Sequence, residues 1–258
     1  MVRTLLVRGM MAGAIVAIFA FGFARTFGEP QVDRAIAFEE AHSDGASHSH
    51  GEASEAHQHA AAAPAAEEEP ELVSRSTQAG IGLLTASIIY GIGIGGLFAL
   101  VFAFVQDRVV SFGPRGTAAL LALAAFLAVA LVPALKFPPN PPAVGHPETI
   151  GYRTAAYFLM VLVSVGAMCF AVSLGRRMAP RLGAWNGGFA GAIAFIAIVA
   201  VAQAMLPGIN EVPDDFPAVV LWNFRVTSLG LQLILWGGIG LVFGAFAERA
   251  MAPTRRVA

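Results

Sequence analysis

The sequence predicts an all-α integral membrane protein, a bundle of about six transmembrane helices with a long disordered histidine-rich outer loop. Two observations predict this fold class. The 258 residues are 57% hydrophobic and only 13% charged, whereas a soluble domain carries roughly 25% charged residues. The apolar residues also fall into runs of about 20, the length that crosses a hydrocarbon core near 30 Å thick.

The membrane helices follow from apolar runs that contain no acidic residue. One helix is expected within residues 1–27, and a five-helix membrane bundle within residues 79–258. The predicted bounds are Leu5–Thr26, Ala79–Val105, Thr117–Leu135, Thr154–Gly175, Ala184–Leu206 and Val226–Phe246. The first run also resembles a signal peptide, but its apolar part is long for one and only a weak small-residue cleavage site follows, so we expect a retained helix.

Glycines four residues apart recur in three of these runs, at Gly91/Gly95, Gly187/Gly191 and Gly240/Gly244. Small residues at this spacing let two membrane helices approach closely. We expect them to bring helices of one chain together rather than to form a dimer interface.

The distribution of charge predicts the orientation. With the N-terminus in the cytoplasm, most basic residues fall in the short inner segments, as the positive-inside rule requires; these are Arg3, Arg8, Arg108, Arg115, Arg176, Arg177, Arg181, Arg249, Arg255 and Arg256. All of the 17 acidic residues except Asp107 and Glu248 fall outside, on a face suited to attracting cations. We therefore expect a multi-pass protein of the bacterial inner (cytoplasmic) membrane, with both termini cytoplasmic and the histidine-rich loop periplasmic. The excess of arginine over lysine suggests the bacterial source.

The first outer loop, residues 28–78, is acidic and rich in histidine. Residues 28–39 could form a short amphipathic helix on the membrane surface. About residues 41–71 are Ala, Ser, His, Glu and Pro with few large apolar side chains, which predicts disorder because too little surface can be buried. All but one of the six histidines lie in or near this stretch: His42, His48, His50, His57 and His59.

Imidazoles beside carboxylates are typical ligands of borderline divalent metals. The loop is therefore expected to gather metal weakly and exchangeably, since a disordered segment cannot fix one coordination geometry. The alternative is a solvated loop that binds metal only incidentally.

Two further outer loops, 136–153 and 207–225, are rich in proline and therefore stiff. With the start of the first outer loop, they supply candidate ligands for a metal entrance site, namely His146, Glu29, Asn140, Glu148, Glu211 and Asp214. An equally supported alternative is that the carboxylates cap helix ends or pair with Arg75, Arg153 and Arg225.

Short motifs in these outer segments carry a family resemblance. They are Gly28-Glu29-Pro30, Ile36-Ala37-Phe38-Glu39, Val73-Ser74-Arg75 with Gln78, Leu135-Lys136, Pro141 to Gly145, Glu148 to Arg153, Leu206-Pro207, Asn210 to Pro213, Asp215-Phe216-Pro217, Leu221-Trp222 and Phe224-Arg225. With them the chain resembles the CbtA family over nearly its full length. The resemblance implies cobalt transport with a small single-helix, histidine-bearing partner, CbtB. The chain departs from the expected pattern at His146, where an acidic residue is expected, and at Phe137-Pro138-Pro139, where Tyr-Pro-Ala is expected.

Absent motifs exclude several classes. The sequence contains no P-loop, no His-Glu-x-x-His and no Gly-x-Ser-x-Gly, and it carries no basic nucleic-acid footprint. We expect no enzyme, no tightly bound cofactor, no nucleotide and no nucleic acid. The expected partners are the lipid bilayer and a divalent metal ion that is transported or transiently bound, such as Co(II).

The sequence thus predicts a membrane subunit of a divalent metal uptake system. The ligand types alone do not choose cobalt, since the same groups hold nickel and copper more tightly; cobalt follows from the resemblance. The alternative is a metal-binding accessory or assembly protein of the membrane that does not itself conduct.

Overall fold

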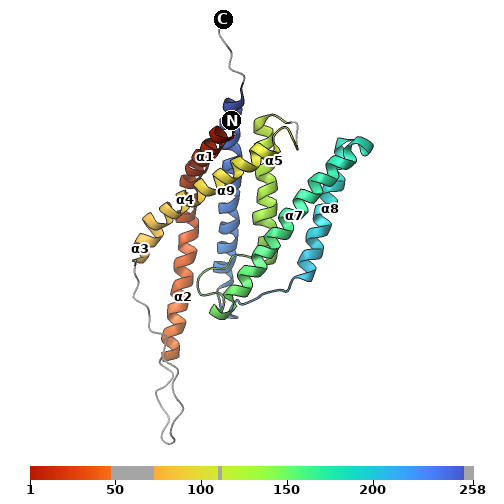
Figure 1. Ribbon diagram of the computed structural model, residues 1–258. Coiled ribbons are helices and arrows are strands. Elements are labelled where there is room, and N and C mark those ends of the chain that lie inside the picture. Colours follow the sequence, from red (N-terminus) through yellow and green to blue (C-terminus); the bar gives the residue numbers. More distant parts are fainter. Residues whose placement is uncertain (48–72, 110–111, 253–258) are drawn as a thin grey trace, which may run out of the picture.

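The computed structural model describes residues 1–47, 73–109 and 112–252, and within these ranges the regular elements are all helices (Figure 1). Six helical spans in the described chain are long and apolar enough to cross a membrane: Val2–His42, Arg75–Val105, Pro114–Lys136, Pro147–Leu182, Ala184–Met205 and Ala218–Met251. Each overlaps one predicted segment closely, so the predicted set of six is confirmed. Several spans are longer than the roughly 20 residues that a bilayer needs, and their ends therefore extend beyond the hydrocarbon layer.

The first span is one continuous rod of α1 (Val2–Phe23), the π-helical turn η1 (Ala24–Gly28) and α2 (Glu29–Ser47). Residues 28–39 are therefore helical, as expected, but they continue the membrane helix instead of forming a separate surface helix. Residues 41–47, expected to be disordered, belong to the same helix. The rest of the stretch predicted to be disordered lies outside the described residues.

Proline follows two of the π-helical turns, η1 and η3 (Phe126–Leu131). In η1 the amide of Glu29 bonds to the carbonyl of Ala24, and the next residue, Pro30, has no amide to donate. In the third span, the amide of Val132 bonds to Leu127 and Pro133 follows. A proline removes one helical hydrogen bond, and a local change to the π-helical pattern lets each helix continue past it.

The remaining elements fill the other spans in chain order. They are α3 (Arg75–Thr77), η2 (Gln78–Gly82), α4 (Leu83–Val105), α5 (Pro114–Ala125), η3 (Phe126–Leu131), α6 (Val132–Lys136), η4 (Pro147–Thr149), α7 (Ile150–Leu182), α8 (Ala184–Met205) and α9 (Ala218–Met251). Helices α1, α4, α5 and α9 form one group, and α7 and α8 form a hairpin beside it (Figure 1).

Glycines place the helix backbones in contact. Gly91 of α4 lies against Gly13 of α1, and a Cβ built on Gly91 would lie 2.6 Å from the Gly13 carbonyl oxygen. A Cβ on Gly187 of α8 would lie 2.6 Å from the carbonyl oxygen of Gly175 on α7. Gly240 of α9 faces Ala122 of α5. The predicted contacts between helices of one chain are confirmed, with Gly13 as a partner that the spacing rule did not identify.

Large side chains fill the interior of the four-helix group. The Phe243 ring packs edge-on against Phe98 and Phe102, with centroid distances of 5.5 and 5.0 Å. Phe102, Ile239 and Phe243 are fully buried. This packing of α4 against α9 makes the group a single apolar core.

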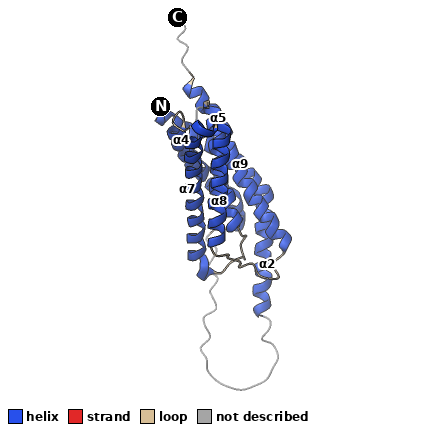
Figure 2. Ribbon diagram, turned by 90° about the vertical axis from the view of Figure 1, so that its right-hand side faces the viewer, coloured by secondary structure: helices blue, strands red, loops and turns tan. Residues whose placement is uncertain are grey.

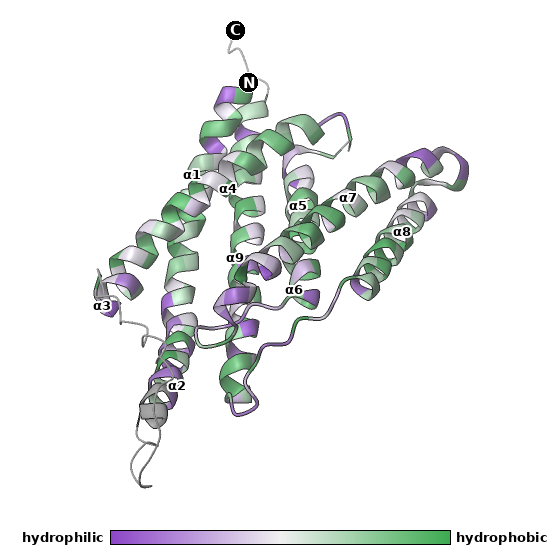
Figure 3. Ribbon diagram, turned by 60° about the horizontal axis from the view of Figure 1, so that its bottom comes forward, coloured by the Kyte–Doolittle hydropathy of each residue, from purple (hydrophilic) through white to green (hydrophobic). Residues whose placement is uncertain are grey.

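The two ends of the bundle differ. The start of α1 and the end of α9 meet at what we call the terminal end, around Val2, Leu5 and Met251. Three of the basic residues assigned to one side of the membrane lie there: Arg176 donates to the Arg108 carbonyl at 2.8 Å, and Arg115 pairs with Glu248 at 2.7 Å. The opposite end, called the loop end, holds the loops 137–146 and 206–217, with α2 beside them (Figure 2). Apolar residues run along most of the helices, and polar residues gather near the helix ends and in parts of the loops (Figure 3).

Candidate functional site

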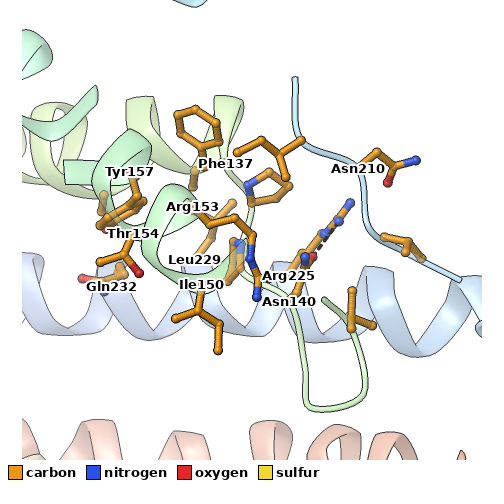
Figure 4. Close-up of a pocket in the computed structure, with 17 residues that line it drawn as sticks. Phe137, Asn140, Ile150, Arg153, Thr154, Tyr157, Asn210, Arg225, Leu229 and Gln232 are labelled. Atoms are coloured by element: carbon orange, nitrogen blue, oxygen red, sulfur yellow. Dashed lines mark hydrogen bonds between the residues drawn. The ribbon is translucent and has the colours of Figure 1, made fainter. Parts of the chain in front are cut away.

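A pocket of about 420 Å³ opens at the loop end, between the hairpin and the four-helix group (Figure 4). Both proline-rich loops, the start of α7 and the first half of α9 contribute to it, and η3 and α6 form one wall. The lining residues with polar side chains are Asn140, Arg153, Thr154, Tyr157, Asn210, Arg225 and Gln232. Apolar side chains such as Phe137, Ile150 and Leu229 complete the lining.

Arg153, in the first turn of α7, ties the two proline-rich loops together. Its Nε lies 3.4 Å from an oxygen of Glu211, and its Nη2 donates to the carbonyl of His146 at 3.3 Å. The same Glu211 oxygen accepts the backbone amide of His146 at 2.9 Å. That amide lowers the pKa of Glu211 below its usual value, with help from the Thr149 hydroxyl and the positive charge of Arg153.

The loop backbone beside Arg153 requires glycine. Gly145 has a φ of +122°, and a Cβ built on it would lie 2.8 Å from the guanidinium carbon of Arg153. Only glycine combines this φ with such a close approach. The last residue of the Pro-Pro-Ala-Val-Gly motif thus makes room for the arginine.

Arg225, in the second turn of α9, has a different environment. Its Nη2 donates to the side-chain oxygen of Asn140 at 2.8 Å. Its Nε is buried without a hydrogen-bond partner among the described residues. No carboxylate of the described residues lies within ion-pair distance of Arg225.

A second arginine cluster lies at the junction of α2 and α3. Arg75 donates to Glu29 at 2.5 Å and to Asp33 at 2.9 Å. The side chain of Glu29 is 11% exposed, so this pair is well shielded from water. Ser74 occupies the N-cap position of α3 without bonding to the helix backbone; its hydroxyl contacts the Thr77 hydroxyl at 3.0 Å instead.

Helix α2 is fastened to the loops by an apolar contact and a polar one. Ala35, Val144 and Phe216 are buried in one small cluster, and Phe38 packs edge-on against Phe216 at 5.0 Å. One turn further along α2, Nε2 of His42 lies 2.7 Å from an oxygen of Asp215, and Nδ1 lies 2.8 Å from the Phe38 carbonyl. Both side chains of the polar pair are exposed.

Deeper in the bundle, η3 separates the pocket from a second cavity. Ala130 lines the pocket, whereas Leu127 lines a cavity of about 620 Å³ toward the terminal end, between η3 and the α7–α8 hairpin. Between them, the buried hydroxyl of Ser164 donates to the carbonyl of Ala128. In the π-helical pattern the carbonyl of Ala128 would accept the amide of residue 133, but Pro133 has none. Ser164 therefore satisfies a carbonyl that the π-helical turn leaves without a partner.

Comparison with known families identifies the chain. A family model described as "Probable cobalt transporter subunit (CbtA)" matches residues 2–248, nearly the whole chain. The chain belongs to the CbtA family. Comparisons with curated proteins and with solved structures gave no match. The family match confirms the resemblance seen in the outer motifs, and the six helical spans agree with a membrane subunit of a cobalt transport system.

Some of the outer-segment residues singled out in the sequence contact arginines at the loop end. Glu29 contacts Arg75, Glu211 contacts Arg153, and Asn140 contacts Arg225. The sequence left open whether Glu29 and Glu211 bind cations or pair with these arginines. In the described structure both are paired.

The other predicted ligands do not converge. In the part of the chain that the structure describes, no group of three or more His, Cys, Asp or Glu side chains is placed to hold a metal ion. His146, Glu148 and Asp214 have exposed side chains, and His42 is paired with Asp215. The remaining predicted ligands, His48, His50, His57 and His59, lie outside the described residues.

Sequence reasoning did not identify the pocket residues Thr154, Tyr157, Asn210 and Gln232, and treated Arg153 and Arg225 only as ion-pair partners. One signal was available. Arg225 stands beside a long apolar run with no acidic residue within nine positions on either side. A charged group at the edge of a membrane helix without a local partner is a marker of function.

Proposed function

We propose that this CbtA-family chain is the membrane subunit of a divalent metal uptake system, with cobalt as the cargo. The family match over residues 2–248 is the observation that carries the proposal. It is supported by six spans suited to a bilayer and by the acidic outer sequence. In this proposal the chain acts as a transporter subunit and not as an enzyme, and Co(II) is cargo rather than a resident cofactor.

The proposed orientation places the loop end in the periplasm and the terminal end in the cytoplasm of a bacterial inner membrane. The grouping of Arg108, Arg115 and Arg176 at the terminal end supports it, because basic residues concentrate on the cytoplasmic side. The histidine-rich segment is then periplasmic, at the end of α2.

The first proposed step is capture by the histidine-rich segment. His42 and Asp215 already combine an imidazole and a carboxylate in one exposed pair, and the sequence supplies His48 and His50 shortly after it. Ligands of these types bind Co(II) reversibly. The segment raises the local metal concentration and releases the ion readily.

The second proposed step occurs at the proline-rich loops. Because Glu29, Glu211 and Asn140 are engaged by arginines, the exposed side chains of His146, Glu148 and Asp214 are the better candidates for transient contact with metal. The paired carboxylates instead keep the loops in place around the pocket.

A second candidate is a metal-gathering subunit whose partner conducts. The observation that favours it is the lack of a converging ligand group in the described residues, together with apolar runs that contain no acidic residue. A single-helix partner such as CbtB would then contribute to the path.

Cobalt accumulation in cells separates the two candidates. Cells expressing the chain alone are compared with cells that also express its genomic neighbours, with radioactive cobalt as the tracer. Uptake by the chain alone supports the conducting subunit, and uptake only with a neighbour supports the gathering subunit. The absence of any cobalt uptake in both strains would contradict the proposed function.

Replacing all five histidines between His42 and His59 by alanine tests the capture step. We expect reduced uptake at low external cobalt and normal uptake at saturating cobalt, because capture changes local concentration and not the path. Equal uptake at all concentrations would refute a role for the segment.

A further inference from the structure

The pocket at the loop end has the wrong charge for a bare metal cation. Its lining contains two arginines and no aspartate or glutamate. The nearest carboxylate, Glu211, is shared between Arg153 and the His146 amide, and Arg225 has only the neutral Asn140 as a hydrogen-bond partner among the described residues. A divalent cation in this pocket would meet uncompensated positive charge in a partly buried setting, where charges interact strongly.

An unused hydrogen-bond donor gives the pocket a chemical preference. The Nε of Arg225 is buried and has no acceptor among the described residues, whereas the Nε of Arg153 already lies 3.4 Å from an oxygen of Glu211. A guanidinium presents its N–H groups as a planar fork that matches the two oxygens of a carboxylate. Buried donors are normally satisfied, and a ligand with acceptor oxygens would satisfy the Nε of Arg225.

The size and lining of the pocket limit the ligand further. Its volume of about 420 Å³ lies in the range of small-molecule sites. Amide and hydroxyl side chains at Asn210, Thr154 and Gln232 add neutral polar contacts, and Figure 4 shows them distributed around the arginines. This arrangement suits a compact ligand with several oxygens better than a long apolar chain.

We propose that the pocket binds a small organic oxyanion, a di- or tricarboxylate held by Arg153 and Arg225. Such an anion can also chelate a divalent metal and carry it as a complex without net positive charge. The inference concerns binding to this protein and does not depend on whether the chain transports metal. Loss of carboxylate binding and loss of cobalt uptake are separate measurements.

Calorimetric titration of the purified full chain with citrate tests the proposal, in nanodiscs of phosphatidylcholine so that no anionic lipid competes. We expect saturable binding that is weakened about tenfold or more in Arg225→Gln, because a charge-assisted contact is lost. Arg225→Lys, which keeps the charge and loses the fork, should be intermediate. Arg115→Gln, at the terminal end, is the matched control and should bind as the wild type does.

A second variant guards against misfolding. If Arg225→Gln does not yield monodisperse protein, Gln232→Leu removes a neutral polar contact from the same pocket and should weaken citrate binding several-fold. The absence of citrate binding by folded wild-type protein would overturn the proposal, as would equal binding by the folded pocket variants.

Two further titrations compare complexed with free cobalt, and a lipid analysis distinguishes a carboxylate from a lipid phosphate. A preformed cobalt–citrate complex should bind with the same dependence on Arg225 as citrate, whereas binding of cobalt chloride should not depend on Arg225; the opposite result would overturn the anion site. The lipid alternative predicts three observations together: the wild type retains phosphatidylglycerol through purification, Arg225→Gln loses it, and citrate does not bind. That result would mean that a lipid phosphate occupies the pocket and that the polycarboxylate proposal is wrong.

Discussion

Helices α1 and α4 meet backbone to backbone, whereas the α7–α8 hairpin joins the four-helix group across a seam with cavities at both ends. In the first region Gly13 and Gly91 leave no room for a side chain. In the second, cavities of about 420 and 620 Å³ lie on opposite sides of η3, with Ser164 between them. Two helices whose backbones are in contact cannot change their separation without losing that contact. A boundary with cavities at both ends can change its separation with less loss of packing. We therefore expect the hairpin to shift relative to the four-helix group more easily than α1 shifts relative to α4.

The largest expected effect comes from breaking the tight region. Gly91→Leu forces a side chain into the Gly13 backbone, so α1 and α4 must separate. Overpacking typically costs about 1–3 kcal/mol, and a clash with backbone falls at or above the upper end. We expect loss of monodisperse protein in size-exclusion chromatography. Gly93→Leu, on the same helix with open space around it, should behave as the wild type; equal damage by both would show that the contact is not special.

A smaller loss is expected when the seam is disturbed at its centre. Ser164→Ala removes the donor that satisfies the Ala128 carbonyl. Leaving a buried acceptor unpaired costs about 1–3 kcal/mol, which should lower the thermal midpoint by a few degrees. Ser173→Ala, at an exposed position of the same helix, is the control. A variant as stable as the wild type would mean that η3 does not need this hydroxyl.

Gly145→Ala tests the loop side of the seam. The substitution places a Cβ against Arg153 at a backbone angle that alanine rarely adopts, with a cost of about 1 kcal/mol or more. We expect a lower thermal midpoint and a displaced Arg153. Gly151→Ala, with open space around it, should leave the thermal midpoint unchanged or slightly raised. Identical midpoints for the Gly145 variant and the wild type would contradict the required glycine.

The smallest expected effect is a dependence on pH. The lowered pKa of Glu211 means that its contacts add stability above the ordinary glutamate pKa of 4.5, and that this stability is lost as the pH falls through the lowered pKa. The thermal midpoint of the wild type should therefore fall more steeply at acidic pH than that of Glu211→Gln. Asp214→Asn, an exposed neighbour, should keep the wild-type slope. Parallel curves for all three proteins would argue against the network.

Apolar run length was enough to predict the six spans, because a bilayer imposes one length on every crossing. Glycine spacing predicted which faces touch, although not that Gly13 is the partner of Gly91. The continuation of the first helix past Pro30 could not be predicted, because proline usually ends a helix. Here a π-helical turn accommodates the amide that Pro30 lacks. For the outer carboxylates, composition allowed both cation binding and pairing with arginine. The distance from Glu211 to Arg153 depends on how two loops, far apart in sequence, fold against each other.

The uninterrupted helical rod from Val2 to Ser47 carries the end of α2, with His42 near it, away from the bilayer. With α1 spanning the hydrocarbon core, the 24 residues that follow in η1 and α2 extend up to about 35 Å at 1.5 Å per residue. That reach is several times the Debye length of about 8 Å at physiological salt. We therefore expect an ion at the end of α2 to be screened from the headgroup charges and to respond to nearby carboxylates of the protein, such as Asp215.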